Sequence, residues 1–180
     1  MSPIFLSSVS LSHAFFITAL SRIHAIILAE AAVAEGKNAV QSQSYGPEAR
    51  GGASKSEVII DDDKIFHPHV KAPDFVLAMT QKAADKYYED LSSDGVLILD
   101  DDLVPSTPDF KNIVRVPITK LAVEKVGRAL FANIVALGVI AKVTGLVDFD
   151  AVKKAVAHRV PPQTIEQNMR ALQIGYDSVK

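Results

Sequence analysis

Residues 41–60 read QSQSYGPEARGGASKSEVII, and this stretch is the most informative part of the chain. Both of its ends are typical of strands, whereas its centre is polar and rich in glycine and other small residues. Tyr45-Gly46-Pro47 predicts a turn, because glycine allows a positive φ and proline fixes the φ that follows. Gly51 and Gly52 have no side chain, so another backbone, a subunit or a ligand could approach closely. We therefore expect a loop between two strands.

The charges of this loop leave two interpretations open. Glu48 and Arg50 place opposite charges beside the turn. In the first interpretation this is an ordinary surface loop that leads into a strand. In the second it is a docking surface, where the Arg50 guanidinium pairs with a carboxylate or a phosphate, an acceptor that its fork of N–H donors fits well.

The composition of the chain excludes several classes of protein. Its 180 residues suit one domain of ordinary size, and we predict a single domain over residues 1–180. A hydrophobic fraction of 48% and a charged fraction of 22% indicate a globular protein. The net charge of -2, without a basic patch, argues against nucleic-acid binding. With no cysteine, the chain cannot supply thiolates to an iron–sulfur cluster, form a disulfide or use a cysteine nucleophile.

The first part of the chain is apolar and carries no Asp, Glu, Lys or Arg before Arg22. A membrane span needs about 20 strongly apolar residues, but residues 1–20 include five serines, a threonine and a histidine. A secretory signal would begin with basic residues, which are missing here. We therefore predict a buried strand and a helix in this region, no membrane association and a cytoplasmic location.

Hydrophobic patterning predicts short strands that alternate with helices. We expect strands at residues 4–9, 39–44, 56–60, 75–79, 96–99 and 113–116, and helices at 15–35, 81–91, 120–126, 130–143, 151–158 and from Pro161-Pro162 onward. Gly36 is a good residue to end the first helix, whereas Thr119 and Asp148 are candidate N-caps for later ones. This alternation indicates an α/β fold with a mostly parallel sheet, helices on both faces and a helical C-terminal part.

Two polar clusters are candidate metal sites. His67 and His69 flank a proline, but without a third ligand nearby the surface-loop interpretation is favoured. Residues 100–102 are three consecutive aspartates that follow a buried strand, where open α/β sheets bind ligands, so they could hold Mg²⁺. A solvated turn with helix-capping character is the favoured interpretation of these aspartates, and of those at residues 61–63.

Asn133 is the one amide inside the apolar helix predicted at residues 130–143. A buried amide must find hydrogen-bond partners, so it could bond to nearby backbone or face a subunit interface or a ligand. The sequence shows no nucleophile elbow, catalytic triad order or phosphate-binding loop. Nothing in it predicts a self-sufficient active site.

The chain resembles the gamma subunit, or gamma domain, of 2-oxoacid:ferredoxin oxidoreductases, and most closely the 2-oxoglutarate type. The resemblance runs from about residue 26 to about residue 176, and residues 41–60 are its most specific part. Shorter matching runs are ILAEAA at 27–32, PDFVLA at 73–78, GVLI at 95–98, NIVALG at 133–138 and RVP at 159–161.

The resemblance implies a Rossmann-like domain that acts as a subunit of a hetero-oligomer. Its partners would be alpha and beta subunits that hold thiamine diphosphate and an iron–sulfur cluster, with a ferredoxin-like delta subunit as a further candidate. The complex would oxidise a 2-oxoacid, for which the resemblance favours 2-oxoglutarate, in a decarboxylation that consumes coenzyme A and passes electrons to ferredoxin. The chain alone would bind no cofactor and be inactive, although it could share the coenzyme A site.

The same resemblance implies no catalytic or metal-binding residue on this chain. It places interface or coenzyme A and substrate-side contacts at Tyr45, Gly46, Pro47, Glu48, Arg50, Gly51, Gly52 and Asn133. The alternative function is a stand-alone, non-catalytic module of the same fold that binds a nucleotide or an acyl-CoA.

One departure from the family concerns the first βα turn. The family has a Gly-Gly-Gln-Gly turn between its first strand and first helix, whereas this chain has no glycine before Gly36 and reads FITALS at residues 16–21. Either this segment is divergent, or the residues before Arg22 are not the native reading of the gene. The anion-binding geometry of a glycine turn at a helix N-terminus is not visible in the sequence.

Overall fold

The computed structural model describes residues 13–18, 22–44, 55–66 and 69–179, and at 13–18, Arg22 and Ser44 it describes only the backbone. Within these residues one six-stranded sheet has the order β2-β3-β1-β4-β5-β6. The strands are β1 (His13–Thr18), β2 (Asn38–Ser44), β3 (Lys55–Asp61), β4 (Phe75–Ala78), β5 (Val96–Asp100) and β6 (Ile113–Val116). The helices are α1 (Arg22–Ala34), α2 (Gln81–Tyr87), α3 (Ile118–Leu121), α4 (Ala132–Thr144), α5 (Phe149–Arg159) and α6 (Ile165–Asp177).

The sheet is parallel over most of its width. Strands β1, β4, β5 and β6 run in one direction and pair side by side. Strands β2 and β3 form an antiparallel pair that adds to β1 at one side. The predicted α/β fold with a mostly parallel sheet is therefore confirmed, and the antiparallel pair contains the two strands predicted around the 45–54 loop.

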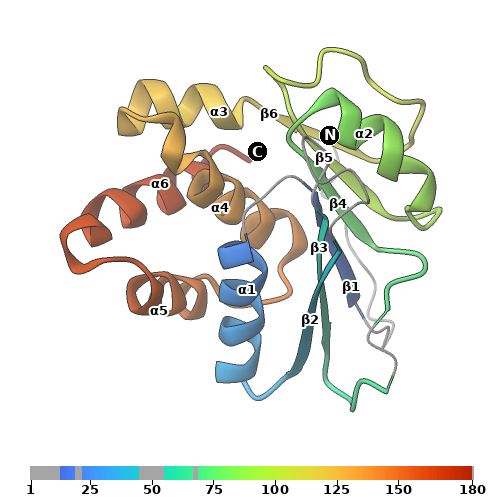
Figure 1. Cartoon of the computed structure of the whole chain (residues 1–180), viewed down its shortest axis with the longest axis horizontal. Coiled ribbons are helices and arrows are strands. Elements are labelled where there is room, and N and C mark those ends of the chain that lie inside the picture. Colours follow the sequence, from blue (N-terminus) through green and yellow to red (C-terminus); the bar gives the residue numbers. More distant parts are fainter. Residues whose placement is uncertain (1–12, 19–21, 45–54, 67–68, 180) are drawn as a thin grey trace.

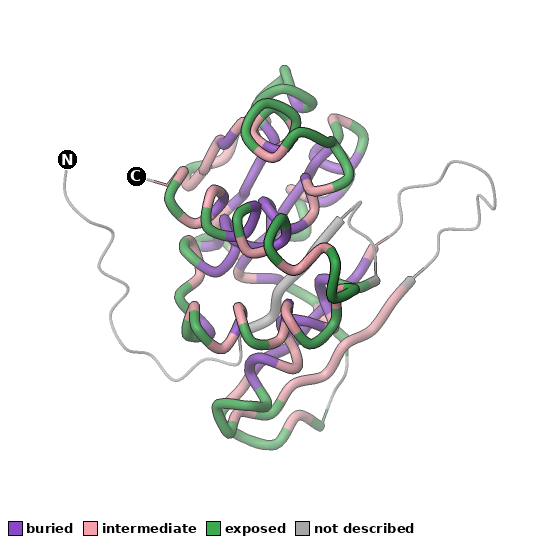
Figure 2. The backbone as a smooth tube through the Cα atoms, turned by 90° about the vertical axis from the view of Figure 1, so that its left-hand side faces the viewer, coloured by how far each residue is buried: buried purple, intermediate pink, exposed green. Residues whose placement is uncertain are grey.

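Helices cover both faces of the sheet unequally (Figure 1). Alternate residues of β4 divide between the two faces: Phe75 and Leu77 pack with α1, α4, α5 and α6, whereas Val76 and Ala78 pack with α2. The larger helical layer contains the C-terminal part of the chain, as predicted. Buried residues concentrate where this layer meets the sheet (Figure 2).

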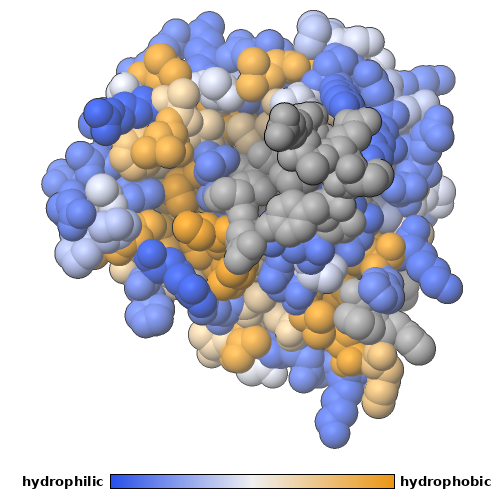
Figure 3. Space-filling model, in the orientation of Figure 1, coloured by the Kyte–Doolittle hydropathy of each residue, from blue (hydrophilic) through white to orange (hydrophobic). Residues whose placement is uncertain are grey.

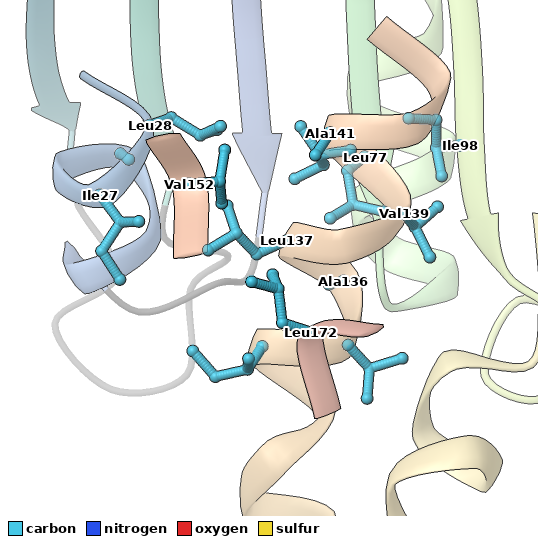
Figure 4. Close-up of a cluster of buried hydrophobic side chains, with 14 of the residues drawn as sticks. Ile27, Leu28, Leu77, Ile98, Ala136, Leu137, Val139, Ala141, Val152 and Leu172 are labelled. Carbon is cyan, nitrogen blue, oxygen red and sulfur yellow. The ribbon is translucent and has the colours of Figure 1, made fainter. Parts of the chain in front are cut away.

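Helix α4 lies at the centre of the larger core. Its sequence is apolar nearly all round, and residues 134–141 are all buried. Leu137 and Val139 lie among side chains of the sheet and of α1, α5 and α6, such as Ile98 and Leu172 (Figure 4). Full burial of such a side chain contributes about 1.5–3 kcal/mol, so this layer supplies much of the stability.

Two predicted helix ends are confirmed. Gly36 follows α1 with φ +84°, and the amides of Gly36 and Lys37 donate to the carbonyls of Val33 and Ala32. These two bonds are those of a Schellman motif, for which glycine is favoured. Asp148 caps α5, because its carboxylate accepts the Asp150 amide at 2.8 Å.

The helix predicted at residues 15–35 is wrong at its start. Residues 13–18 form β1, a central strand between β3 and β4, and α1 begins only at Arg22. The run FFIT is apolar, and a short apolar run carries no periodicity that distinguishes a buried strand from a buried helix. The strand predicted at residues 4–9 and the first βα turn at 19–21 lie outside the described residues.

No helix in the described part of the chain is long and apolar enough to cross a membrane.

Candidate functional site

The carboxyl edge of the sheet gathers the segments that sequence analysis singled out. Because β1, β4, β5 and β6 are parallel, their last residues lie at one edge. Thr18 at the end of β1 pairs with Lys55, which in turn pairs with Ser44 at the end of β2. The described residues that flank the 45–54 loop therefore lie at this carboxyl edge.

This edge also contains the point where the chain changes face. After β1 the chain enters α1 on one face, whereas after the neighbouring β4 it enters α2 on the other. In open α/β sheets, ligands bind in the crevice that such a reversal leaves beyond the strand ends. The edge between β1 and β4 is thus the candidate site on topological grounds.

Asp100, the last residue of β5, accepts hydrogen bonds from Thr119 in α3 and so holds the start of this helix at the carboxyl edge. Its side chain is fully buried, and one carboxylate oxygen accepts the Thr119 amide at 3.1 Å and the Thr119 hydroxyl at 2.5 Å. The other oxygen accepts the Asp102 amide at 3.2 Å. Burial raises the pKa of Asp100, although these three hydrogen bonds oppose that rise.

Two predictions about these residues are wrong. Asp100 is a buried structural carboxylate rather than part of a solvated turn, although Asp101 and Asp102 are exposed as predicted. Thr119 does not cap a helix at 120–126, because α3 already begins at Ile118 after Pro117, and the Thr119 amide is taken by Asp100. Since its lone pairs already accept these donors, we assign Asp100 a structural role.

Asp100→Ala should lower the free energy of unfolding by about 1–3 kcal/mol, since it leaves the half-buried amide and hydroxyl donors of Thr119 without their acceptor. Asp102→Ala is the matched control, because the side chain of this exposed neighbour makes no hydrogen bond or ion pair within the described residues and should change stability by at most about 0.5 kcal/mol. Urea unfolding of both variants measures the difference. Equal effects would mean that the Asp100 contacts contribute nothing.

An ion pair between half-buried Lys55 and buried Glu57 lies at the start of β3. The Lys55 ammonium lies 2.5 Å from a carboxylate oxygen of Glu57, and the Ser42 hydroxyl donates to the other oxygen at 2.7 Å. The Lys55 Nζ atom also lies 5.8 Å from the centre of the Tyr87 ring in α2. This cluster anchors the end of the 45–54 loop on the α2 face of the sheet.

Ser56 lies on the opposite face, between Lys55 and Glu57 in sequence. Its hydroxyl is buried and makes no hydrogen bond in the described structure. It lies on the same face as Val58, which packs in the core with α1. The sequence predicted the alternation of Lys55, Ser56 and Glu57 but not the ion pair, because the spacing of Lys55 and Glu57 on one strand does not show how deeply they are buried.

The predicted site residues divide into two groups. Those at positions 45–52, from Tyr45 to Gly52, lie outside the described residues. Asn133 lies in the first turn of α4, where it is half-buried and its amide makes no hydrogen bond to any described residue. Its predicted role at an interface or a ligand stays a prediction.

Two hollows on the described surface lie along α1. One, of about 470 Å³, lies between α1 and α5 and is lined partly by Glu30, Glu35 and Asp148. The other, of about 370 Å³, is an apolar groove between α1 and β2. The acidic groups of the first are already engaged: Glu30 pairs with Arg159, and Glu35 accepts the Asp148 amide at 2.6 Å. We therefore place the candidate site at the carboxyl edge.

Within the described residues, no group of three or more His, Cys, Asp or Glu side chains is arranged to hold a metal ion. His69 is exposed, and the rest of its predicted pair, His67, lies outside the described residues.

Comparison with known proteins identifies relatives over most of the chain. Residues 24–178 match the family model described as pyruvate ferredoxin/flavodoxin oxidoreductase. The chain is 43% identical over 154 residues to 2-oxoglutarate synthase subunit KorC of Methanocaldococcus jannaschii, which covers 83% of this chain and 82% of that one. It is 31% identical over 157 residues to pyruvate synthase subunit PorC of Methanothermobacter marburgensis, with coverages of 86% and 88%.

A solved structure shares the fold. The keto/oxoacid ferredoxin oxidoreductase gamma subunit of Geobacter sulfurreducens superposes with a TM-score of 0.83 at 44% sequence identity. The match covers 92% of this chain and 97% of that chain. The likeness therefore extends over most of the chain.

Proposed function

Because the chain belongs to the pyruvate ferredoxin/flavodoxin oxidoreductase family, we propose that it is the gamma subunit of a 2-oxoglutarate:ferredoxin oxidoreductase. The observation that carries this proposal is the 43% identity to a 2-oxoglutarate synthase subunit over four-fifths of both chains. The pyruvate synthase subunit is less similar, at 31%. The complex would convert 2-oxoglutarate and coenzyme A to an acyl-CoA and carbon dioxide, and pass two electrons to ferredoxin.

In this proposal the chain, as one domain, supports a reaction whose redox groups lie elsewhere. Thiamine diphosphate and the iron–sulfur cluster would belong to alpha and beta partner subunits, and a ferredoxin-like delta subunit is a further candidate partner. The lack of cysteine supports this division, because cluster ligands are normally thiolates. We place the complex in the cytoplasm.

We assign the carboxyl edge as the part of the chain that faces the shared site. Its topology supports this, since the edge combines the change of face between β1 and β4 with the flanks of the 45–54 loop. The loop would contact a partner or coenzyme A through Arg50, Gly51 and Gly52. The ion pair of Lys55 and Glu57, which is partly buried, would hold one end of the loop in place.

The purified chain alone should show no oxidation of 2-oxoglutarate, whereas the complex reconstituted with its partner chains should reduce a viologen dye when 2-oxoglutarate and coenzyme A are both present. With the complex, kcat/KM for 2-oxoglutarate should exceed that for pyruvate by about tenfold or more. Omission of coenzyme A is the control. Turnover by the chain alone would end the subunit proposal, and a preference for pyruvate would end only the substrate assignment.

A further inference from the structure

The connection from α3 to α4 forms a corner of the molecule that we call the α3–α4 corner, residues 120–131. It follows β6 and the first half of α3, and consists of the last two residues of α3, a π-helical turn (Ala122–Val126), Gly127 and Arg128, and a 3₁₀ turn (Ala129–Phe131). Single π-turns of this kind occur often at functional sites. In Figure 3, apolar and hydrophilic residues lie side by side over this part of the surface.

Two large apolar side chains of the corner are exposed. Leu130 exposes 73% of its surface and Val123 exposes 48%. Val123 directly follows Ala122, which is fully buried. Leu130 lies two residues before Ala132, which is also buried. The corner therefore exposes apolar side chains to solvent, while buried residues on either side of them pack into the core.

The same corner carries three cations close in sequence to these apolar side chains. Lys120, Lys125 and Arg128 are all exposed, and none has an ion-pair partner among the described residues. Glu124 is the one carboxylate in residues 120–131. This local positive charge stands out because the whole chain has a net charge of -2.

The backbone of the corner is fixed by its own hydrogen bonds. Gly127, at φ +100°, donates its amide to the Ala122 carbonyl at 3.0 Å, and the Phe131 amide donates to the Arg128 carbonyl at 3.2 Å. A surface that is already ordered loses little conformational entropy when it binds. The corner thus has the rigidity that an interface requires.

We propose that the α3–α4 corner docks an acidic surface of a partner subunit, with Leu130 inserted into an apolar recess of that subunit. The inference rests on the proposed subunit role and names the surface that serves it. Unpaired cations around an apolar centre select a partner of opposite charge and match the usual interface pattern of apolar core and polar rim. A small anionic ligand fits less well, because such ligands bind in concave sites and Leu130 projects outward.

The first test replaces the apolar anchor. Leu130→Ser should weaken the affinity of the full chain for its partner chains at least tenfold, without a change in its own melting temperature. Phe66→Ser is the matched control, because Phe66 exposes 81% and lies between β3 and β4, whose adjoining ends are at the opposite edge of the sheet. Affinity is measured by biolayer interferometry on the immobilised partner complex.

The second test reverses charge. The double variant Lys125→Glu/Arg128→Glu should bind the partner chains at least tenfold more weakly than the wild type. Added salt should lower the affinity of the wild type but not that of the double variant. Lys64→Glu/Lys71→Glu makes the same change of net charge at exposed lysines elsewhere and should bind as the wild type does.

The outcomes separate the inference from the proposed function. Wild-type affinity in both corner variants would overturn the docking surface while the subunit role stood. Normal assembly with a raised KM for coenzyme A would also overturn it and make the corner an anion site. Failure of the wild-type chain to bind the partners would overturn the proposed function, and this inference with it.

Discussion

Gly175→Ala should destabilise the isolated chain by about 3 kcal/mol or more, although a glycine inside a helix is usually less stable than alanine by about 1 kcal/mol. A Cβ atom at position 175 in α6 would lie 1.9 Å from the carbonyl oxygen of Val135 in α4. The reciprocal contact is as short, since a Cβ at Gly138 would lie 2.1 Å from the carbonyl oxygen of Leu172. Both obstacles are helix backbone, so α4 and α6 would have to separate.

Chemical denaturation of Gly175→Ala and Gly138→Ala gives the measurement, and both should be less stable than the wild type. Gln167→Ala is the control, because Gln167 is an exposed residue of α6 whose side chain makes no hydrogen bond within the described residues, so the change should alter stability by at most about 0.5 kcal/mol. A gain of stability in both glycine variants would show that the two helices do not pack backbone against backbone.

This glycine pair also shows where prediction from sequence stops. The apolar run around Gly138 predicted a buried helix, and the structure confirms it. The role of Gly138 could not be predicted, because it depends on contact with Gly175, which lies 37 positions later in another helix. A local pattern reports how apolar a segment is, whereas the approach of two helices is a property of the assembled core.

Strand predictions succeeded where neighbouring residues marked the boundaries. Residues 113–116 coincide with β6, whereas β2, β4 and β5 differ from their predicted ranges by one residue at one end and β3 by one residue at each end. β1 was missed because no turn signal separates it from α1: the chain has no glycine before Gly36. Its assignment as a strand depends on pairing with β3 and β4, which lie 37 or more positions further along the chain.

The candidate site was predicted in outline from sequence. The position of the aspartates at 100–102 after a buried strand pointed to the carboxyl edge, and the flanks of the 45–54 loop lie there as well. The chemistry of individual groups was not predicted. Whether Asp100 faces solvent or accepts bonds from Thr119 depends on where β6 and α3 come to lie, which no local pattern records.

Arg50→Ala should weaken binding of the chain to its partner subunits by about 2–5 kcal/mol, if the guanidinium forms a desolvated charge pair in the complex as we propose. The same change should alter the free energy of unfolding of the isolated chain by only about 0–1 kcal/mol, the usual contribution of an exposed charge. Arg170→Ala is a matched control, because Arg170 is exposed on α6 without an ion pair in the described structure and should bind as the wild type does.

Gly51→Val tests the same loop by adding bulk instead of removing charge. It should weaken assembly more than it lowers the melting temperature, because the expected contact at Gly51 is with a partner or coenzyme A rather than with the chain itself. Paired measurements of melting temperature and of affinity for the partner chains and for coenzyme A decide between three roles. Wild-type binding by both loop variants would make the loop an ordinary surface turn. Unfolding of the free chain by both would make it a structural element, since a residue needed for folding is already in contact before any partner arrives. Loss of affinity with an intact fold is the result that a docking loop at the carboxyl edge requires.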